Sequence, residues 1–74
     1  MRNLPDVIDK MLEVIPLENN SLIGGLESIQ SSALFAAPEI QSFWWQECAS
    51  FLNRSISEMS EDLKIKLEHI FMGE

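Results

Sequence analysis

The stretch from Pro38 to Ser55 constrains the fold of this chain most strongly, because it contains most of the aromatic side chains. It reads PEIQSFWWQECASFLNRS and holds both tryptophans and two of the four phenylalanines. Pro38 suits the first position of a helix, where its missing N–H costs nothing. The apolar residues that follow recur at helical spacing: Ile40, Phe43, Trp44, Cys48, Phe51 and Leu52. We therefore expect a helix over residues 38–55.

The apolar side of this expected helix is wider than one neighbouring helix can cover. At about 100° per residue, its apolar positions run from Phe43 to Trp45 over roughly 200°, whereas a helix covered on one side needs only about 100°. The helix should therefore lie in the centre of a bundle or turn one edge toward a partner. Trp44, near the middle of the arc, is expected to serve the fold. Phe43 and Trp45, at its edges, are expected to contact a partner, although another helix of the same bundle is an alternative cover for Trp45.

Three further segments repeat the apolar spacing of a helix. Each has a capping residue before it and a breaking residue after it: Asn3 and Pro16, Asn20 or Ser21 and Pro38, and Ser60 and Gly73. The sequence shows no strand pattern and no internal repeat. It therefore predicts one all-α domain over residues 1–74, a small bundle of about four helices.

Gly24 and Gly25 interrupt the second of these four helical segments. Each lowers the stability of a helix by about 1 kcal/mol relative to alanine. The helix is therefore expected either to start after the two glycines or to use them for close contact with the backbone of a neighbour.

The chain is short for a domain that is stabilised by neither a disulfide nor a bound metal ion. It has 74 residues, one cysteine and one histidine, so an intrachain disulfide is excluded and no metal site or cofactor is expected. Cys48 falls on the apolar side of its helix, where a free thiol behaves as a small hydrophobe. A hydrophobic fraction of 46% without staples indicates that self-association into a homo-oligomer completes the bundle.

The charge of the chain narrows the classes of partner. Its formal net charge is -7, which disfavours nucleic acid and anionic membranes, because both are bound through lysine and arginine. Asp6, Asp9 and Glu13 form an acidic stripe, which is either a solvated face or a docking surface for a basic protein partner. The free thiol and the absence of a secretion signal in the first residues indicate a cytoplasmic protein.

Residues 25–29, Gly-Leu-Glu-Ser-Ile, are similar to a known functional motif. They resemble the Gly-x-Asp-Ser-Leu signature of acyl and peptidyl carrier proteins, which are small acidic four-helix domains. In that family the serine stands at a helix start and carries phosphopantetheine, a role that the resemblance would give to Ser28. The chain departs from the family at Glu27, in its shorter first loop and in its long aromatic third helix.

No arrangement of residues for catalysis is visible in the sequence. A nucleophilic serine or cysteine needs a paired base, and the single imidazole, of His69, lies in an ordinary amphipathic helix. We therefore expect a protein without catalytic activity that binds another protein as a regulator or inhibitor. The alternatives are a structural homo-oligomer with no separate target and a carrier protein modified at Ser28.

Overall fold

The computed structural model describes residues 2–73 and shows four helices in this range. The helices are α1 (Leu4–Val14), α2 (Asn20–Leu34), α3 (Gln41–Arg54) and α4 (Glu61–Met72). Short 3-10 helices, η1 (Pro38–Ile40) and η2 (Ile56–Glu58), precede and follow α3. The described residues contain no strand, so the prediction of an all-α bundle of about four helices is confirmed. The expected helix over residues 38–55 is present as η1 followed directly by α3.

The ends of α1 and α4 follow the local signals in the sequence, whereas the N-cap of α2 is Asn19, without a side-chain hydrogen bond, so the prediction of Asn20 or Ser21 as this cap is wrong. The Asn3 side chain accepts a hydrogen bond from the Asp6 backbone N–H at 3.0 Å, and Ser60 Oγ accepts one from the Leu63 N–H at 3.1 Å. Gly73 ends α4 in the left-handed region at a φ of 85°, where glycine carries no steric penalty. These caps fix where α1 begins and where α4 begins and ends.

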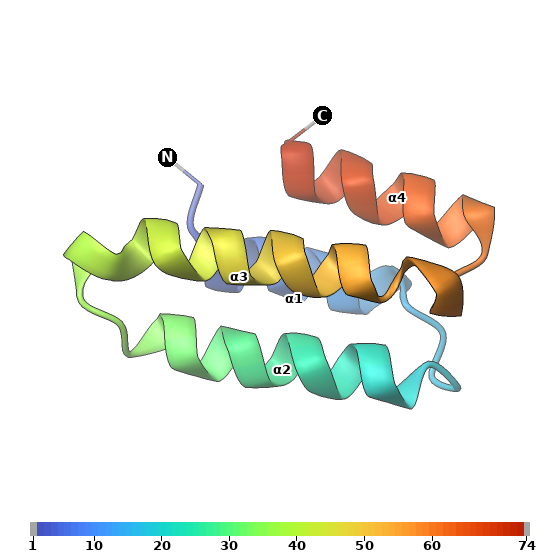
Figure 1. Ribbon diagram of the computed structural model, residues 1–74, viewed down its shortest axis with the longest axis horizontal. Helices are drawn as coiled ribbons and strands as arrows, with labels where there is room; N and C mark the ends of the chain where they lie inside the picture. Colours follow the sequence, from blue (N-terminus) through green and yellow to red (C-terminus); the bar gives the residue numbers. More distant parts are fainter. Residues whose placement is uncertain (1, 74) are drawn as a thin grey trace.

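The four helices pack as an incomplete ring. Helix α1 packs against both α2 and α4, and α2 also packs against α3. The backbones of α3 and α4 make few direct contacts, so this side of the ring is the most open. In Figure 1, α1 lies behind α3, and the turn that joins α2 to α3 lies at the opposite end of the bundle from the turn that joins α1 to α2.

Helix α1, not the aromatic helix α3, forms the centre of the core. Four of its side chains are buried, whereas α3 buries only Cys48, and its tryptophans remain half-buried. The full set of buried apolar residues is Leu4, Val7, Ile8, Met11, Ile15, Leu22, Leu26, Ala33, Cys48, Leu63 and Leu67. The wide apolar arc of α3 therefore does not mean a central position, and part of it stays accessible.

Both glycines lie inside α2, so the helix does not start after them. A Cβ atom at Gly25 would overlap the ring of Phe51, which packs directly on the α2 backbone. A Cβ atom at Gly24 would meet nothing within 4 Å. Close contact between helices therefore explains Gly25 and leaves Gly24 without a packing role.

A candidate protein-binding surface

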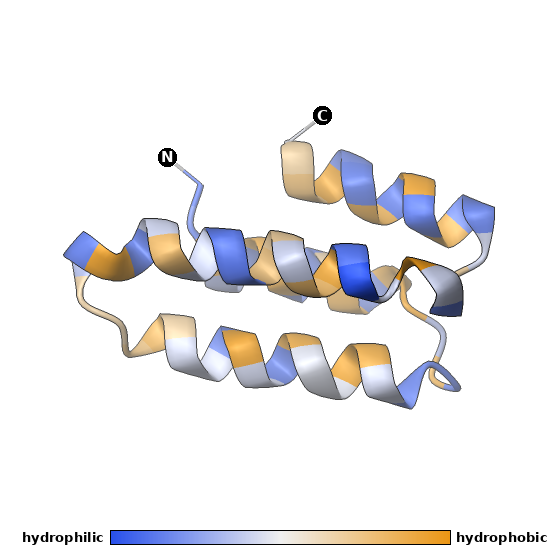
Figure 2. Cartoon of the chain, viewed as in Figure 1, coloured by the Kyte–Doolittle hydropathy of each residue, from blue (hydrophilic) through white to orange (hydrophobic). Residues whose placement is uncertain are grey.

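Phe35 is the most exposed large apolar side chain of residues 2–73, with 86% of its surface accessible. It follows the last residue of α2, just before the Ala37–Pro38 break. Three neighbours in the sequence are also exposed: Leu34 at 62%, Ile40 at 46% and Phe43 at 50%. We name these four residues the apolar turn. In Figure 2 the connection between α2 and α3 is coloured pale orange, in keeping with its apolar composition.

Hydrogen bonds hold the backbone of the apolar turn in one conformation. The N–H of Ala36 donates to the carbonyl of Ala33 at 3.2 Å, and the N–H of Ile40 donates to the carbonyl of Ala37 at 3.0 Å. The side chain of Gln41 reaches across from α3 to the carbonyls of Ala33 and Ala36, both at 3.5 Å. Phe35 is therefore presented on an ordered turn, which lowers the entropy that a partner must remove on binding.

The apolar turn exposes a large total area. From their exposed fractions and ordinary side-chain areas, the four residues present about 450 Å² of mostly apolar surface to solvent. Leu34 adjoins Phe35 in the chain, and Ile40 and Phe43 lie three residues apart across the junction of η1 and α3, so the two members of each pair are close in space. The summed area lies within the range of about 300–600 Å² for the largest apolar patch on a typical monomer, which is often functional.

The charged residues in the sequence around the apolar turn are all acidic. Residues 11–53 contain no lysine or arginine. Glu39 lies inside the turn, directly before Ile40, and Glu47 lies one helical turn beyond Phe43 on α3. Both carboxylates are exposed. The apolar surface is therefore bordered by negative charge.

The two aromatic residues predicted as contacts have different surroundings. Phe43 is half-exposed, and its ring meets that of Trp44 edge-on at 5.0 Å between centroids. Trp45 is half-buried, with its ring centroid 5.4 Å from that of Phe71 on α4. The guanidinium of Arg2 lies 5.3 Å from the Trp45 ring centroid. Trp45 is thus covered by another helix of its own bundle, whereas Phe43 belongs to the apolar turn.

The predicted acidic residues lie on the outer side of α1 and are all exposed. Asp6 accepts a hydrogen bond from the Asn3 side chain at 2.9 Å, and Asp9 accepts one from Gln30 of α2 at 2.7 Å. Asp6 also lines a groove with Arg2 and His69, so the acids of α1 have their described contacts with α2, α4 and the start of the chain. Their role in binding a partner stays a prediction.

Leu34, Phe35 and Ile40 are the residues of this surface that were not predicted as contacts, since Ile40 was expected on the apolar side of its helix. For Leu34 and Phe35 a signal was present, because both fall outside the apolar stripe that α2 turns toward the core. That stripe runs through Leu22, Leu26 and Ala33, which are all buried. Two large apolar residues outside a buried stripe, directly before a helix break, indicate an exposed apolar end.

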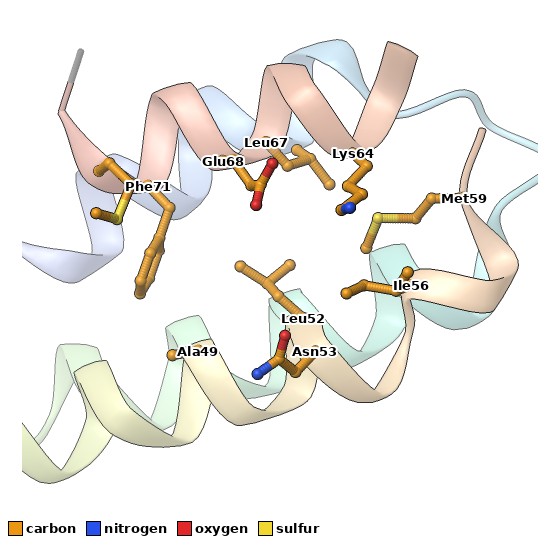
Figure 3. A pocket seen from close by; sticks show the side chains of 10 residues that line it. Ala49, Leu52, Asn53, Ile56, Met59, Lys64, Leu67, Glu68 and Phe71 are labelled. Carbon is orange, nitrogen blue, oxygen red and sulfur yellow. The ribbon is translucent and has the colours of Figure 1, made fainter. Parts of the chain in front are cut away.

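A second apolar surface lies between α3 and α4, on the open side of the ring. It is a groove of about 290 Å³, just below the range of about 300–1,000 Å³ that is usual for small-molecule sites. Figure 3 shows Leu52 of α3 and Phe71 of α4 extending into the space between the two helices. Lys64 and Glu68 of α4 also line the groove, so its charges are of both signs.

The structure locates the residues that the sequence raised for nucleophilic chemistry, cofactor attachment and metal binding. Burial raises the pKa of the Cys48 thiol to about 12, so the thiol stays protonated and is a poor nucleophile. Ser28 is exposed but lies in the middle of α2, and not at a helix start as in the carrier proteins. Within residues 2–73, no three histidine, cysteine or acidic side chains are grouped to hold a metal ion.

No helix in the described part of the chain is long and apolar enough to cross a lipid bilayer. Comparisons with models of protein families, with curated proteins and with solved structures give no match to this chain. Evidence about its function therefore comes from its own residues.

Proposed function

We propose that this protein acts as a regulator or inhibitor by binding another protein through the apolar turn, with no catalytic step. The observation that carries this proposal is Phe35, whose side chain is 86% exposed on a turn held by hydrogen bonds. Phenylalanine, like tryptophan and tyrosine, is enriched at the cores of protein interfaces. The buried free thiol of Cys48 fits a reducing compartment, so we place this contact in the cytoplasm.

The expected arrangement has Phe35 as the anchor and Phe43 as the second contact. Truncation of an aromatic anchor at an interface commonly costs about 2 kcal/mol or more of binding energy. Removal of Phe35 should cost the fold little, because most of its side chain contacts only solvent. Binding and stability can therefore be separated at this residue.

Leu17 supplies a matched control for Phe35. It is 82% exposed and lies in the turn between α1 and α2, at the opposite end of the bundle (Figure 1). We would immobilise the wild-type chain, Phe35→Ser and Leu17→Ser, and compare the proteins that each retains from a lysate of the producing cells. Circular dichroism melts would first confirm that all three chains are equally folded.

We expect the wild type and Leu17→Ser to retain the same protein, and Phe35→Ser to lose it. Retention of that protein by Phe35→Ser at wild-type yield would contradict the proposed site. Equal loss with both variants would show that general apolar adhesion, and not a specific contact, explains the capture.

A structural homo-oligomer is the second candidate, and the groove between α3 and α4 favours it. The groove is apolar, and Lys64 and Glu68 give it charges of both signs, so two copies related by a two-fold axis could pair these charges. Sedimentation equilibrium of the wild type and of Ile56→Glu, which alters the exposed rim of the groove, tests this function. A dimer in the wild type that dissociates in the variant would support the oligomer.

A further inference from the structure

We infer that the apolar turn is occupied by a protein surface in which lysine or arginine side chains surround an apolar pocket for Phe35, and not by a second copy of this chain. This inference rests on the proposed function and adds the chemistry of the partner. It depends on the acidic border of the turn, on the area that the turn exposes and on the exposure of Phe35.

The charges at this end of the molecule favour a basic partner. Glu39 and Glu47 are exposed beside the apolar turn, and residues 11–53 contain no lysine or arginine. Arg2, whose guanidinium lies 5.3 Å from the Trp45 ring centroid, donates to the carbonyls of Ile70 and Phe71. Cations on the rim of a partner would pair with these carboxylates and raise the rate of association, because electrostatic complementarity acts mainly on encounter and specificity. The net charge of -7 adds to the same attraction at longer range.

The same charges oppose contact between two copies through this surface. A two-fold axis through the apolar turn would bring Glu39 and Glu47 of one copy close to the same residues of the other. The apolar turn offers about 450 Å² of this chain, whereas stable interfaces bury about 800 Å² per partner, so a stable partner must also cover the acidic border, where a second copy brings carboxylates and a basic partner brings cations. A concave partner can enclose the Phe35 ring from several sides, and so bury more of it than a flat symmetric contact can.

Two designed helical peptides provide the probe. In both peptides one face of the helix consists of leucines with a single alanine, which leaves a small apolar pocket. Lysines border this face in the first peptide, and glutamates border it in the second. Each is titrated into the full-length protein labelled with ¹⁵N, and amide shifts are followed by NMR at low and at high salt. Added salt screens charge pairs at the surface and leaves apolar contacts largely unchanged.

We expect the lysine peptide to shift the amides around Phe35, Glu39 and Phe43, and the glutamate peptide to leave them unchanged. The affinity of the lysine peptide for the protein should fall about tenfold from low to high salt, because salt screens the charges at the surface. Phe35→Ser should abolish these shifts, whereas Leu17→Ser should retain them. The double substitution Glu39→Gln and Glu47→Gln, which keeps Phe35, should weaken binding several-fold and remove most of the salt dependence.

Three results would overturn the inference. The glutamate peptide could bind the turn as well as the lysine peptide does, or the shifts could map to the α3–α4 groove or to the acids of α1. The amides of the turn could also shift on concentrating the protein alone, which would identify a second copy as the occupant. The first result would leave the proposed site in place and refute only the basic partner, whereas the capture experiment with Phe35→Ser tests the site itself.

Discussion

Alanine substitutions at the neighbouring residues Gly24 and Gly25 should change stability in opposite directions. Gly24 is open to solvent inside α2, with nothing within 4 Å of an added Cβ. Alanine is a better helix former than glycine by about 1 kcal/mol. We therefore expect Gly24→Ala to stabilise the protein by about 0.5–1 kcal/mol.

At Gly25 the same gain in helix propensity meets a steric conflict. The added Cβ would come within 2.8 Å of Cε2 of Phe51 and closer still to Cζ and Cε1. The ring must move off the α2 backbone, and overpacking of this kind costs about 1–3 kcal/mol. Subtracting the propensity gain of about 1 kcal/mol leaves a net cost of about 0–2 kcal/mol, and we expect Gly25→Ala to fall in the upper half of this range because the overlap with the Phe51 ring is severe.

Urea denaturation followed by circular dichroism measures both effects on one scale. The free energy of unfolding of a small domain falls by about 1–3 kcal/mol per molar urea, so a change of about 1 kcal/mol moves the urea midpoint by about 0.3–1 M, and the two variants should separate clearly. Phe51→Leu in the Gly25→Ala background should recover part of the loss, because residues in contact are not additive. If Gly25→Ala proves as stable as Gly24→Ala, then Phe51 does not pack on Gly25 and the placement of α3 on α2 is wrong.

Three further substitutions test the contacts of Arg2 and Trp45 and the burial of the Cys48 thiol. Arg2→Ala should lower the free energy of unfolding by about 1–2 kcal/mol, because the guanidinium donates to two carbonyls at the end of α4 and lies over the Trp45 ring; a urea melt that matches the wild type would contradict this. Trp45→Ala should cost about 2–4 kcal/mol through lost contact with Phe71, and an unchanged Tm would show that Trp45 serves only an external contact. The unfolded chain releases the Cys48 proton near pH 9.0 and the folded chain only near pH 12. Stability should therefore fall as the pH rises above 9, by at most about 1.4 kcal/mol per pH unit. Cys48→Ala should lack this pH-dependent loss of stability when it is unfolded with urea at several pH values. An equal pH dependence in the wild type and the variant would refute this prediction.

The sequence predicted the local features of the fold well, because they depend on neighbouring residues. The Asn3 and Ser60 caps, the breaks near Pro16 and Pro38 and the stop at Gly73 are each determined within one helical turn. The apolar spacing of residues 38–55 also placed Cys48 on the apolar side of its helix, and this side chain is buried.

The order of packing could not be predicted, because an apolar stripe does not specify which helix will cover it. The abundance of aromatic residues suggested α3 as the centre, whereas the bundle is built on the shorter aliphatic side chains of α1. Trp45 illustrates this for a single side chain. The sequence placed it at the edge of the apolar arc, but its ring is covered by Phe71 and Arg2, which lie far from it in the sequence.

The candidate site was predicted only in part, for a related reason. Phe43 was identified from its place at the edge of the apolar arc, and it is half-exposed in the structure. Leu34 and Phe35 were not predicted because they lie outside the apolar stripe by which a helix is recognised, and Ile40 was not predicted because it lies within the apolar arc of its own helix. The acidic residues of α1 are exposed as expected, and their role in binding stays a prediction.

Photo-crosslinking in the producing cells tests the central claim most directly. A photoreactive phenylalanine analogue replaces Phe35 in one chain and Leu17 in another, so that two equally exposed positions at opposite ends are compared. We expect irradiation to join the chain labelled at position 35 to one other protein, and to give no such product at position 17. A product with the mass of two copies of the chain, or no product at position 35, would contradict the claim that Phe35 anchors a separate protein partner.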